Sequence, residues 1–186
     1  MKKTTKFLLA LGSIVSLTTL PLIAAKCGGT KEESKSETTT TNEEVTVDTI
    51  AKNLKDILVV TSDVKTKDGL DKLKKDSSKY TLWYDRKIER IVMVEGTNPP
   101  FGKKFDGEKW GIFDLNDKGS TIKSPYQLVN AKEPIFKGTS LSTRLDFTLD
   151  AKKETITIEY KVGKFLGKDN DPDVSKESNK STISIK

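Results

Sequence analysis

Histidine is absent from this sequence of 186 residues. The side chain that titrates nearest to neutral pH, and that most often binds transition metals, is therefore missing. A serine nucleophile would lack its usual base, and the sequence contains neither a Gly-x-Ser-x-Gly elbow nor a phosphate-binding loop. The 27 acidic residues offer many carboxylate pairs for glycoside hydrolysis, but no pair stands out. We therefore expect a protein that is not an enzyme and that carries no cofactor.

Arginine is also scarce, because 30 of the 33 basic residues are lysines. Arginine is the side chain that makes forked, bidentate contacts to phosphate. The formal charge is +6, but four lysines and no acidic residue precede Cys27, which leaves 29 basic and 27 acidic residues for the rest of the chain. A balance of +2 over that length gives no basic field that would attract phosphates. Nucleic acid is not an expected partner.

Cys27 is the only cysteine, so the chain cannot form an internal disulfide. It follows a basic start and an uncharged run, residues 7–25, which together are typical of an export signal. The alternative is an uncleaved membrane anchor, since the run approaches the ~20 residues that cross a bilayer. Pro21 and several serine and threonine residues disfavour that alternative. In an exported protein a blocked thiol at Cys27 is the simplest interpretation.

The first 44 residues resemble the bacterial membrane lipoproteins, and more narrowly the surface lipoproteins of mycoplasmas. The elements that carry the resemblance are a Lys-Lys start, a Phe-Leu-Leu run, the junction Ala-Ala-Lys-Cys-Gly-Gly that ends at Gly29, and the Lys- and Glu-rich stretch after it. The resemblance implies that a signal peptide, 1–26, is removed and that Cys27 becomes the lipidated first residue. Lys26 stands where the general motif has a small residue, and it looks like a mycoplasma variant.

The lipid on Cys27 would hold the protein on the extracellular face of the cell membrane. Two acyl chains give durable anchoring, since each buried methylene contributes about 0.8 kcal/mol. Residues 28–44 contain no aliphatic or aromatic side chain, so 27–44 is predicted to be a lipidated cysteine followed by a flexible spacer. Such a spacer has a root-mean-square reach of roughly 20 to 25 Å. The remaining residues, 45–186, are predicted to form one globular domain.

This domain is predicted to be α+β and mainly antiparallel β, possessing an N-terminal helix. The helix is indicated by apolar residues spaced three and four apart along one face, namely Val47, Ile50, Ala51, Leu54, Ile57 and Leu58. A short second helix is expected around Leu70 and Leu73. Aromatic and β-branched residues predict strands at 80–84, 87–95 and 109–115.

A hairpin is the most specific structural prediction. Apolar residues alternate along 145–149 and again along 156–162, separated by a loop at 151–154. A four-residue loop would place Leu149 opposite Ile156 and Phe147 opposite Ile158. The last six residues alternate as well, so the chain should end in a paired strand with its isoleucines inward. A small sandwich is the expected arrangement of the sheet.

Three segments were candidates for chemistry. Asp169, Asp171 and Asp173 have the spacing that begins a calcium loop, but Val174 and Lys180 stand where that loop needs glycine and glutamate, so no metal site is predicted. The polar and aromatic stretch 83–86 is explained by strand alternation. The candidate recognition loop lies in residues 98–110 and contributes Phe101, Phe105 and Trp110. Its aromatics either anchor a ligand or complete the core under a long connection, and the second alternative is the commoner one.

The functional expectation is a lipid-anchored cell-surface protein, non-catalytic, acting as an antigen or adhesin-like binding module for a host or envelope macromolecule. The alternative is an accessory or solute-binding lipoprotein of a transporter. Only the order of anchor, spacer and domain suggests that alternative, and a ligand-filled cleft would favour it.

Overall fold

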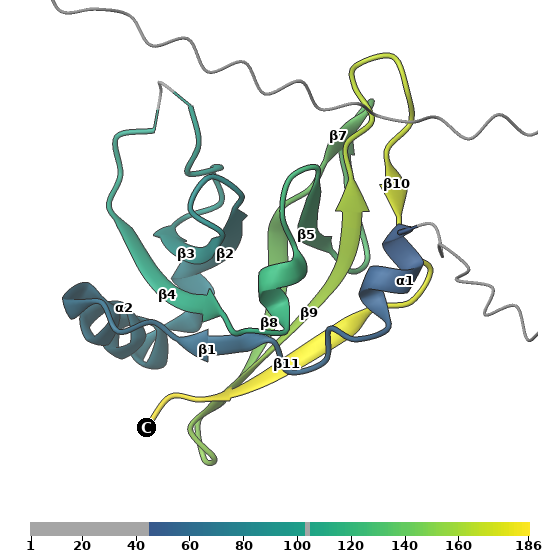
Figure 1. Cartoon of the computed structure of the whole chain (residues 1–186). Coiled ribbons are helices and arrows are strands. Elements are labelled where there is room, and N and C mark those ends of the chain that lie inside the picture. Colours follow the sequence, from purple (N-terminus) through teal and green to yellow (C-terminus); the bar gives the residue numbers. More distant parts are fainter. Residues whose placement is uncertain (1–44, 103–104) are drawn as a thin grey trace, which may run out of the picture. The chain divides into compact units, whose positions relative to one another are not determined.

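The computed structural model of the chain describes residues 45–102 and 105–186 (Figure 1). The expected signal peptide, Cys27 and the spacer lie outside the described residues. Residues Asn42–Lys186 make up one compact unit. All strand pairs and both apolar clusters of the described residues lie within this unit, so we expect it to fold without the preceding chain.

The described residues form two helices, two single 3₁₀ turns and a predominantly antiparallel set of strands. The helices are α1 (Val47–Ala51) and α2 (Val64–Lys75), and the 3₁₀ turns are Ser77–Lys79 and Gly119–Thr121. The strands are β1 (Leu58–Val60), β2 (Tyr80–Asp85), β3 (Arg90–Glu95), β4 (Lys109–Leu115), β5 (Tyr126–Asn130), β6 (Ile135–Lys137), β7 (Ser140–Leu141), β8 (Arg144–Asp150), β9 (Thr155–Lys164), β10 (Asp173–Val174) and β11 (Asn179–Ser184).

The main sheet follows the order β1-β4-β3-β2-β8-β9-β10, and β5 and β11 also pair with β9. It curls so that β1, at one end, lies beside β11: the Asp56 amide donates to the Lys180 carbonyl oxygen (3.2 Å) and the Ile57 amide donates to Ser181 Oγ (2.9 Å). β6 and β7 form a separate small hairpin. The architecture is thus one curled sheet, a half-barrel, and the expected sandwich of two stacked sheets is wrong.

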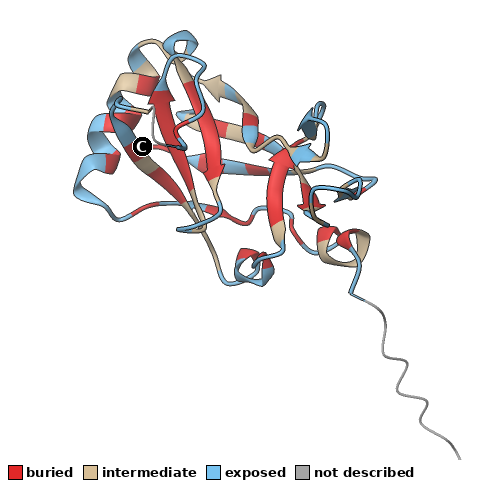
Figure 2. Cartoon of the chain, turned by 90° about the horizontal axis from the view of Figure 1, so that it is seen from above, coloured by how far each residue is buried: buried red, intermediate tan, exposed pale blue. Residues whose placement is uncertain are grey.

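Most buried side chains lie inside the curl, and the buried residues run along the strands in Figure 2. The interior is made of aliphatic and aromatic residues from both halves of the sheet, including Leu82, Met93, Leu128, Ile158 and Val162. A second, small cluster of Trp83, Val92 and Val94, with Phe105 packed against it, lies on the outer face of β2 and β3. Alternation along each strand separates the two clusters.

The first helix is shorter than predicted. α1 begins at a capping box in which Thr46 and Thr49 bond each other's backbone, and it ends at Ala51. Asp56 has a positive φ of 53°, a conformation that no helix contains, and Leu58 already belongs to β1. Leu54 and Ile57 are nevertheless buried. The apolar spacing identified core residues correctly but misassigned the backbone that presents them.

The remaining local predictions are confirmed. α2 contains Leu70 and Leu73 on its buried face, and β2 and β4 occupy the predicted segments. β3 starts at Arg90, three residues later than predicted, because residues 86–89 form the turn from β2. In the β8–β9 hairpin Leu149 pairs with Ile156 and Phe147 with Ile158, as predicted. The chain end pairs with β9 as strand β11, and Ile183 and Ile185 are buried.

Candidate ligand-binding cavity

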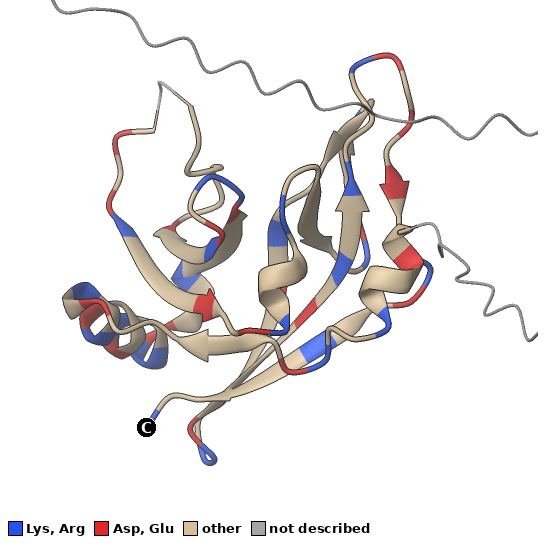
Figure 3. Ribbon diagram, viewed as in Figure 1, with Lys and Arg blue, Asp and Glu red and all other residues tan. Residues whose placement is uncertain are grey.

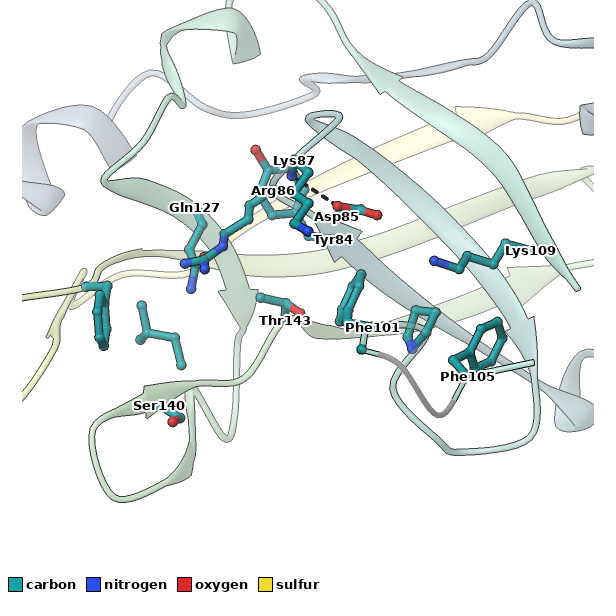
Figure 4. A pocket seen from close by; sticks show the side chains of 14 residues that line it. Tyr84, Asp85, Arg86, Lys87, Phe101, Phe105, Lys109, Gln127, Ser140 and Thr143 are labelled. Atoms are coloured by element: carbon teal, nitrogen blue, oxygen red, sulfur yellow. Dashed lines mark hydrogen bonds between the residues drawn. The ribbon is translucent and has the colours of Figure 1, made fainter. Parts of the chain in front are cut away.

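A cavity of about 490 Å³ opens between the outer face of β2 and the β6–β7 hairpin. Four strands and four connections contribute to its walls, and Figure 4 shows the lining side chains. The lining residues are Tyr84, Asp85, Arg86, Lys87, Pro100, Phe101, Gly102, Phe105, Lys109, Gln127, Ser140, Leu141, Thr143 and Phe165. They come from four separate stretches of sequence, 84–87, 100–109, 127–143 and 165, which the curled sheet brings together.

The aromatic wall is built on the outer-face cluster. Trp83 is fixed by its Nε1, which donates to Thr81 Oγ1 at 2.8 Å, and Phe101 meets the Trp83 ring edge-on with centroids 6.1 Å apart. Lys109 Nζ lies 5.9 Å from the Phe101 ring centroid and 5.4 Å from that of Phe105. These are cation–π distances, so the lysine holds the two phenylalanines beside one another.

The opposite wall is the β6–β7 hairpin, which lies close against β9. A Cβ atom at Gly163 would come within 3.0 Å of both Leu141 Cδ atoms, so only glycine lets the hairpin approach this closely. The segment after β7 then ties the two halves of the sheet together. The Asn130 amide donates to the Ser142 carbonyl oxygen (2.8 Å), and the Tyr84 amide donates to the Thr143 carbonyl oxygen (2.8 Å). The wall is therefore fixed by the backbone.

Two buried polar side chains border this cavity without a protein partner. Gln127 is 5% exposed and Tyr84 is 1% exposed, yet neither side chain forms a hydrogen bond with any described residue. Burial, together with the carboxylates of Glu89 and Asp85, raises the pKa of Tyr84 above its ordinary value. Asn130, on the same strand as Gln127 and 6% exposed, bonds three backbone groups. Gln127 differs from Asn130 because its amide borders the cavity, where a ligand or water can form hydrogen bonds with it.

The charges at the cavity are mainly positive. Arg86, Lys87 and Lys109 line it, against a single carboxylate, Asp85. No described acidic residue forms an ion pair with any of the three cations. The Asp85 carboxylate accepts a hydrogen bond from the Lys87 backbone amide (3.0 Å), which holds it at the turn. Figure 3 shows the basic residues, in blue, at the turn after β2 and at the start of β4. The arrangement suits an anionic group.

The structure brings together two of the three predicted loop residues. Phe101 and Phe105 both line the cavity, whereas Trp110 does not. Lys109 pairs with Val94 and Trp110 with Met93, so the two neighbours face opposite sides of the sheet. Trp110 is buried under α2, where its Nε1 donates to Asp68 Oδ2 at 2.9 Å. A Cβ at Gly69 would approach Trp110 Cβ to 2.8 Å, which shows how closely the helix covers it.

Sequence reasoning missed most of the cavity. Strand alternation accounts for the stretch 83–86 in the sequence, whereas in the structure Tyr84, Asp85 and Arg86 line the cavity. No sequence motif marks Gln127. Gln127 is a polar residue within the short strand Tyr-Gln-Leu-Val-Asn. Its position indicates a binding role only when the structure shows that both faces of β5 are covered.

A second, smaller cavity of about 380 Å³ lies beside Trp83 and Phe136. An ion pair between Lys132 and Asp146 (3.7 Å) neutralises two of its charged side chains, and Asn130, which also lines it, has its hydrogen bonds completed. It therefore offers a ligand less than the first cavity does. Its Arg144 and Phe136 serve below as matched controls.

The comparisons with known proteins give no family. No protein-family model matches the chain, no curated protein is significantly similar to it, and no solved structure matches its fold significantly. Among the helices of the described residues, none combines the length and the apolar character that crossing a bilayer requires. Within the same residues no group of three potential metal-ligating side chains was found.

Proposed function

We propose that this chain is a lipid-anchored bacterial cell-surface protein whose globular domain is a non-catalytic ligand-binding module, with the cavity between β2 and the β6–β7 hairpin as its binding site. One observation carries the binding part: the amide of Gln127, a residue only 5% exposed, forms no hydrogen bond with the described residues and borders a cavity of about 490 Å³. That volume falls in the range of roughly 300 to 1,000 Å³ that is typical of small-molecule sites.

The accessibility of the Gln127 amide supports a binding role. Among the described residues, Thr61 Oγ1 is the one side-chain polar atom that is closed off from solvent and has no partner, so the Gln127 amide is reached from the cavity. A ligand in the cavity can complete the amide's hydrogen bonds in place of water. The amide then contributes to affinity and to selectivity.

The anchor rests on the sequence, on the junction of Ala25, Lys26 and Cys27 with the two glycines that follow. Intact mass spectrometry of the protein extracted from its native membrane tests it. We expect a mature chain that begins at a diacylated Cys27. An unmodified Cys27 with residues 1–26 still attached would refute the anchor and leave the leader as a membrane segment.

Ligand binding is tested by thermal unfolding of the mature chain, residues 27–186 with Cys27→Ser, against a panel of small molecules. A ligand present at about 100 times its Kd stabilises the native state by about 2.7 kcal/mol, which raises Tm by several degrees. The rise should disappear in Phe101→Ala and persist in Phe136→Ala, a matched control outside the cavity. A rise that is equal in both variants would place the binding elsewhere.

A second candidate function is adhesin-like contact with a host or envelope macromolecule. It is favoured by large apolar side chains that remain at the surface: Phe136 is 69% exposed and Phe101 is 40% exposed, with Phe165 and Leu166 also exposed. Aromatic residues of this kind anchor protein interfaces. Alanine at Phe101, Phe105 and Phe136 should then reduce binding of the protein to host cells while Tm stays unchanged. The cavity favours the small-ligand, accessory or solute-binding function over this one.

A further inference from the structure

We propose that the ligand of the cavity is a small organic anion with an apolar body, and that its acidic group binds at the end formed by Arg86, Lys87 and Gln127. The inference deepens the proposed binding function and depends on it. It rests on where the charges, the open amide and the apolar surfaces lie along the cavity.

The balance of charged side chains around the cavity indicates the sign of the ligand's charge. Three cationic side chains line the cavity against one carboxylate, and the cations have no acidic partner among the described residues. The one carboxylate, Asp85, is held by the Lys87 backbone amide. A cationic ligand would meet three like charges, whereas an anionic ligand completes the missing ion pairs.

The two ends of the cavity differ in what they offer an acidic group. Lys109 at one end already lies over two phenyl rings, at 5.9 and 5.4 Å from their centroids. At the other end the Arg86 side chain extends toward the Gln127 amide in Figure 4. A guanidinium presents a planar fork that matches a carboxylate or phosphate, and the amide NH₂ adds a further donor. The acidic group therefore fits best between Arg86 and Gln127.

The space beside that end is apolar. Phe101, Leu141 and Phe165 contribute the main apolar surfaces: Phe101 from the β3–β4 connection, Leu141 from β7 and Phe165 from the segment after β9. Phe101 and Phe165 are partly exposed, so a bound apolar group would remove their surface from water. An inorganic anion would leave this surface uncovered. The ligand is therefore expected to carry an apolar or planar body next to its acidic group.

The experiment uses two fluorescent probes that share an aromatic body but differ in charge. The anionic probe is 8-anilinonaphthalene-1-sulfonate, and the neutral one is N-phenyl-1-naphthylamine, which lacks the sulfonate. Each is titrated into the mature chain, residues 27–186 with Cys27→Ser, whose native state is checked by near-ultraviolet circular dichroism. We expect saturable 1:1 binding of the anionic probe, at least about fivefold tighter than that of the neutral probe, since one charge-assisted hydrogen bond is worth that much.

Substitutions of charged and polar side chains show where the acidic group of the ligand binds. Arg86→Gln should weaken the anionic probe about fivefold and leave the neutral probe unchanged, because the lost contact is to the sulfonate alone. Arg144→Gln is the matched control, an exposed arginine on β8 that does not line this cavity. Gln127→Leu should weaken the anionic probe as well. Added salt should reduce the difference between the probes, since exposed charges are screened.

Competitors identify the type of anion. Decanoate has a flexible chain, 2-naphthoate has a planar ring, and inorganic phosphate is an acidic group without a body. Displacement of the anionic probe by decanoate or by 2-naphthoate supports the proposal, and the stronger of the two identifies a lipid-like or an aromatic ligand. Displacement by phosphate at the same concentration as 2-naphthoate would overturn the apolar part of the proposal.

The outcomes separate this inference from the proposed function. Equal binding of both probes, unaffected by Arg86→Gln but lost in Phe101→Ala, would overturn the anionic ligand and keep the cavity as a binding site. Failure of either probe to bind the folded protein, with no ligand of the panel shifting Tm, would overturn both. Equal weakening of the anionic probe by Arg86→Gln and Arg144→Gln would overturn the assignment of the acidic group to this end.

Discussion

Two regions of the sheet bury polar side chains to a similar extent but complete their hydrogen bonds differently. Where β9 and β11 meet, Tyr160 donates to the Leu54 carbonyl oxygen (2.6 Å) and lies 2.7 Å from Ser181 Oγ. A tyrosine hydroxyl has one proton, so Ser181 donates to Tyr160 and in turn accepts from the amides of Ile57 (2.9 Å) and Leu58 (3.3 Å). At the cavity, Gln127 and Tyr84 have no such partners among the described residues.

The two regions have different roles in the protein. The Tyr160–Ser181 network joins the connection between α1 and β1, the start of β1, β9 and β11, the segments where the curled sheet closes, and every member has its partners. A fully satisfied network specifies one structure. The cavity side leaves polar groups without partners among the described residues but open to solvent, so they are free to bind a ligand. Mutations in the network should therefore lower the stability of the fold, whereas mutations at the cavity should mainly change ligand binding.

The largest effect is expected from removing the closing strand. Deletion of residues 179–186 takes away β11, which supplies Ser181 and Ile183 and covers one edge of β9, together with the buried Ile185 that follows it. We expect loss of cooperative thermal unfolding, measured by circular dichroism. Removal of Lys186 alone, which is exposed, should leave Tm unchanged. Cooperative melting of the longer deletion would show that β11 is an addition to the fold and not its closure.

A single substitution in the closing network comes next. Ser181→Ala leaves two buried backbone amides and the Tyr160 hydroxyl without their partner, which should cost about 3 kcal/mol in the free energy of unfolding. Urea unfolding measures this change. Ser184→Ala, an exposed position on the same strand, is the control and should change stability by less than about 0.5 kcal/mol. Similar losses in the two variants would contradict the role of the network.

The pH dependence of stability reports on the same network. Burial raises the pKa of Tyr160 to about 12, whereas an unfolded tyrosine titrates at about 10. The native state prefers the neutral hydroxyl, so its contribution is present in full below pH 10 and is lost as the pH rises through 12. From about pH 9 to about pH 11.5 the loss should reach about 2 kcal/mol.

Urea unfolding across this pH range, in the wild-type chain and in Tyr160→Phe, isolates the contribution of Tyr160. The variant should be less stable at pH 9 but should lose less stability on going to high pH, since it lacks the Tyr160 hydroxyl and its ionisation. Parallel declines in the two proteins would mean that Tyr160 ionises with an ordinary pKa.

The smallest effect is expected at the cavity. Gln127→Leu removes a buried amide that has no partner, so stability should change by less than about 0.5 kcal/mol or should increase. Asn130→Leu, on the same strand and equally buried, removes three hydrogen bonds and should cost about 2 kcal/mol. Urea unfolding of the two variants compares them directly. An equal cost would mean that the two amides are equally satisfied, and the contrast between the regions would fail.

Local patterns predicted local structure well. The β8–β9 register followed from alternation and loop length, because a hairpin is fixed by residues that are neighbours in sequence. The helix prediction across 47–58 failed in part, since apolar residues three and four apart also fit a short helix followed by an extended segment. Phe101 and Phe105 of the candidate loop both line the cavity, whereas Trp110, which was grouped with them on proximity in sequence alone, faces the other side of the sheet.

The sequence by itself determined the hairpin and its register, the second helix, and which apolar residues are buried, because side-chain period and turn length act over a few residues. The lipidated Cys27 and the spacer remain predictions from sequence. Only the tertiary structure decided that β1 and β11 close the sheet, that Trp110 faces α2 while Lys109 faces the cavity, and that Arg86 and Gln127 line the same cavity. These depend on pairings between strands far apart in the chain, and no local pattern contains them.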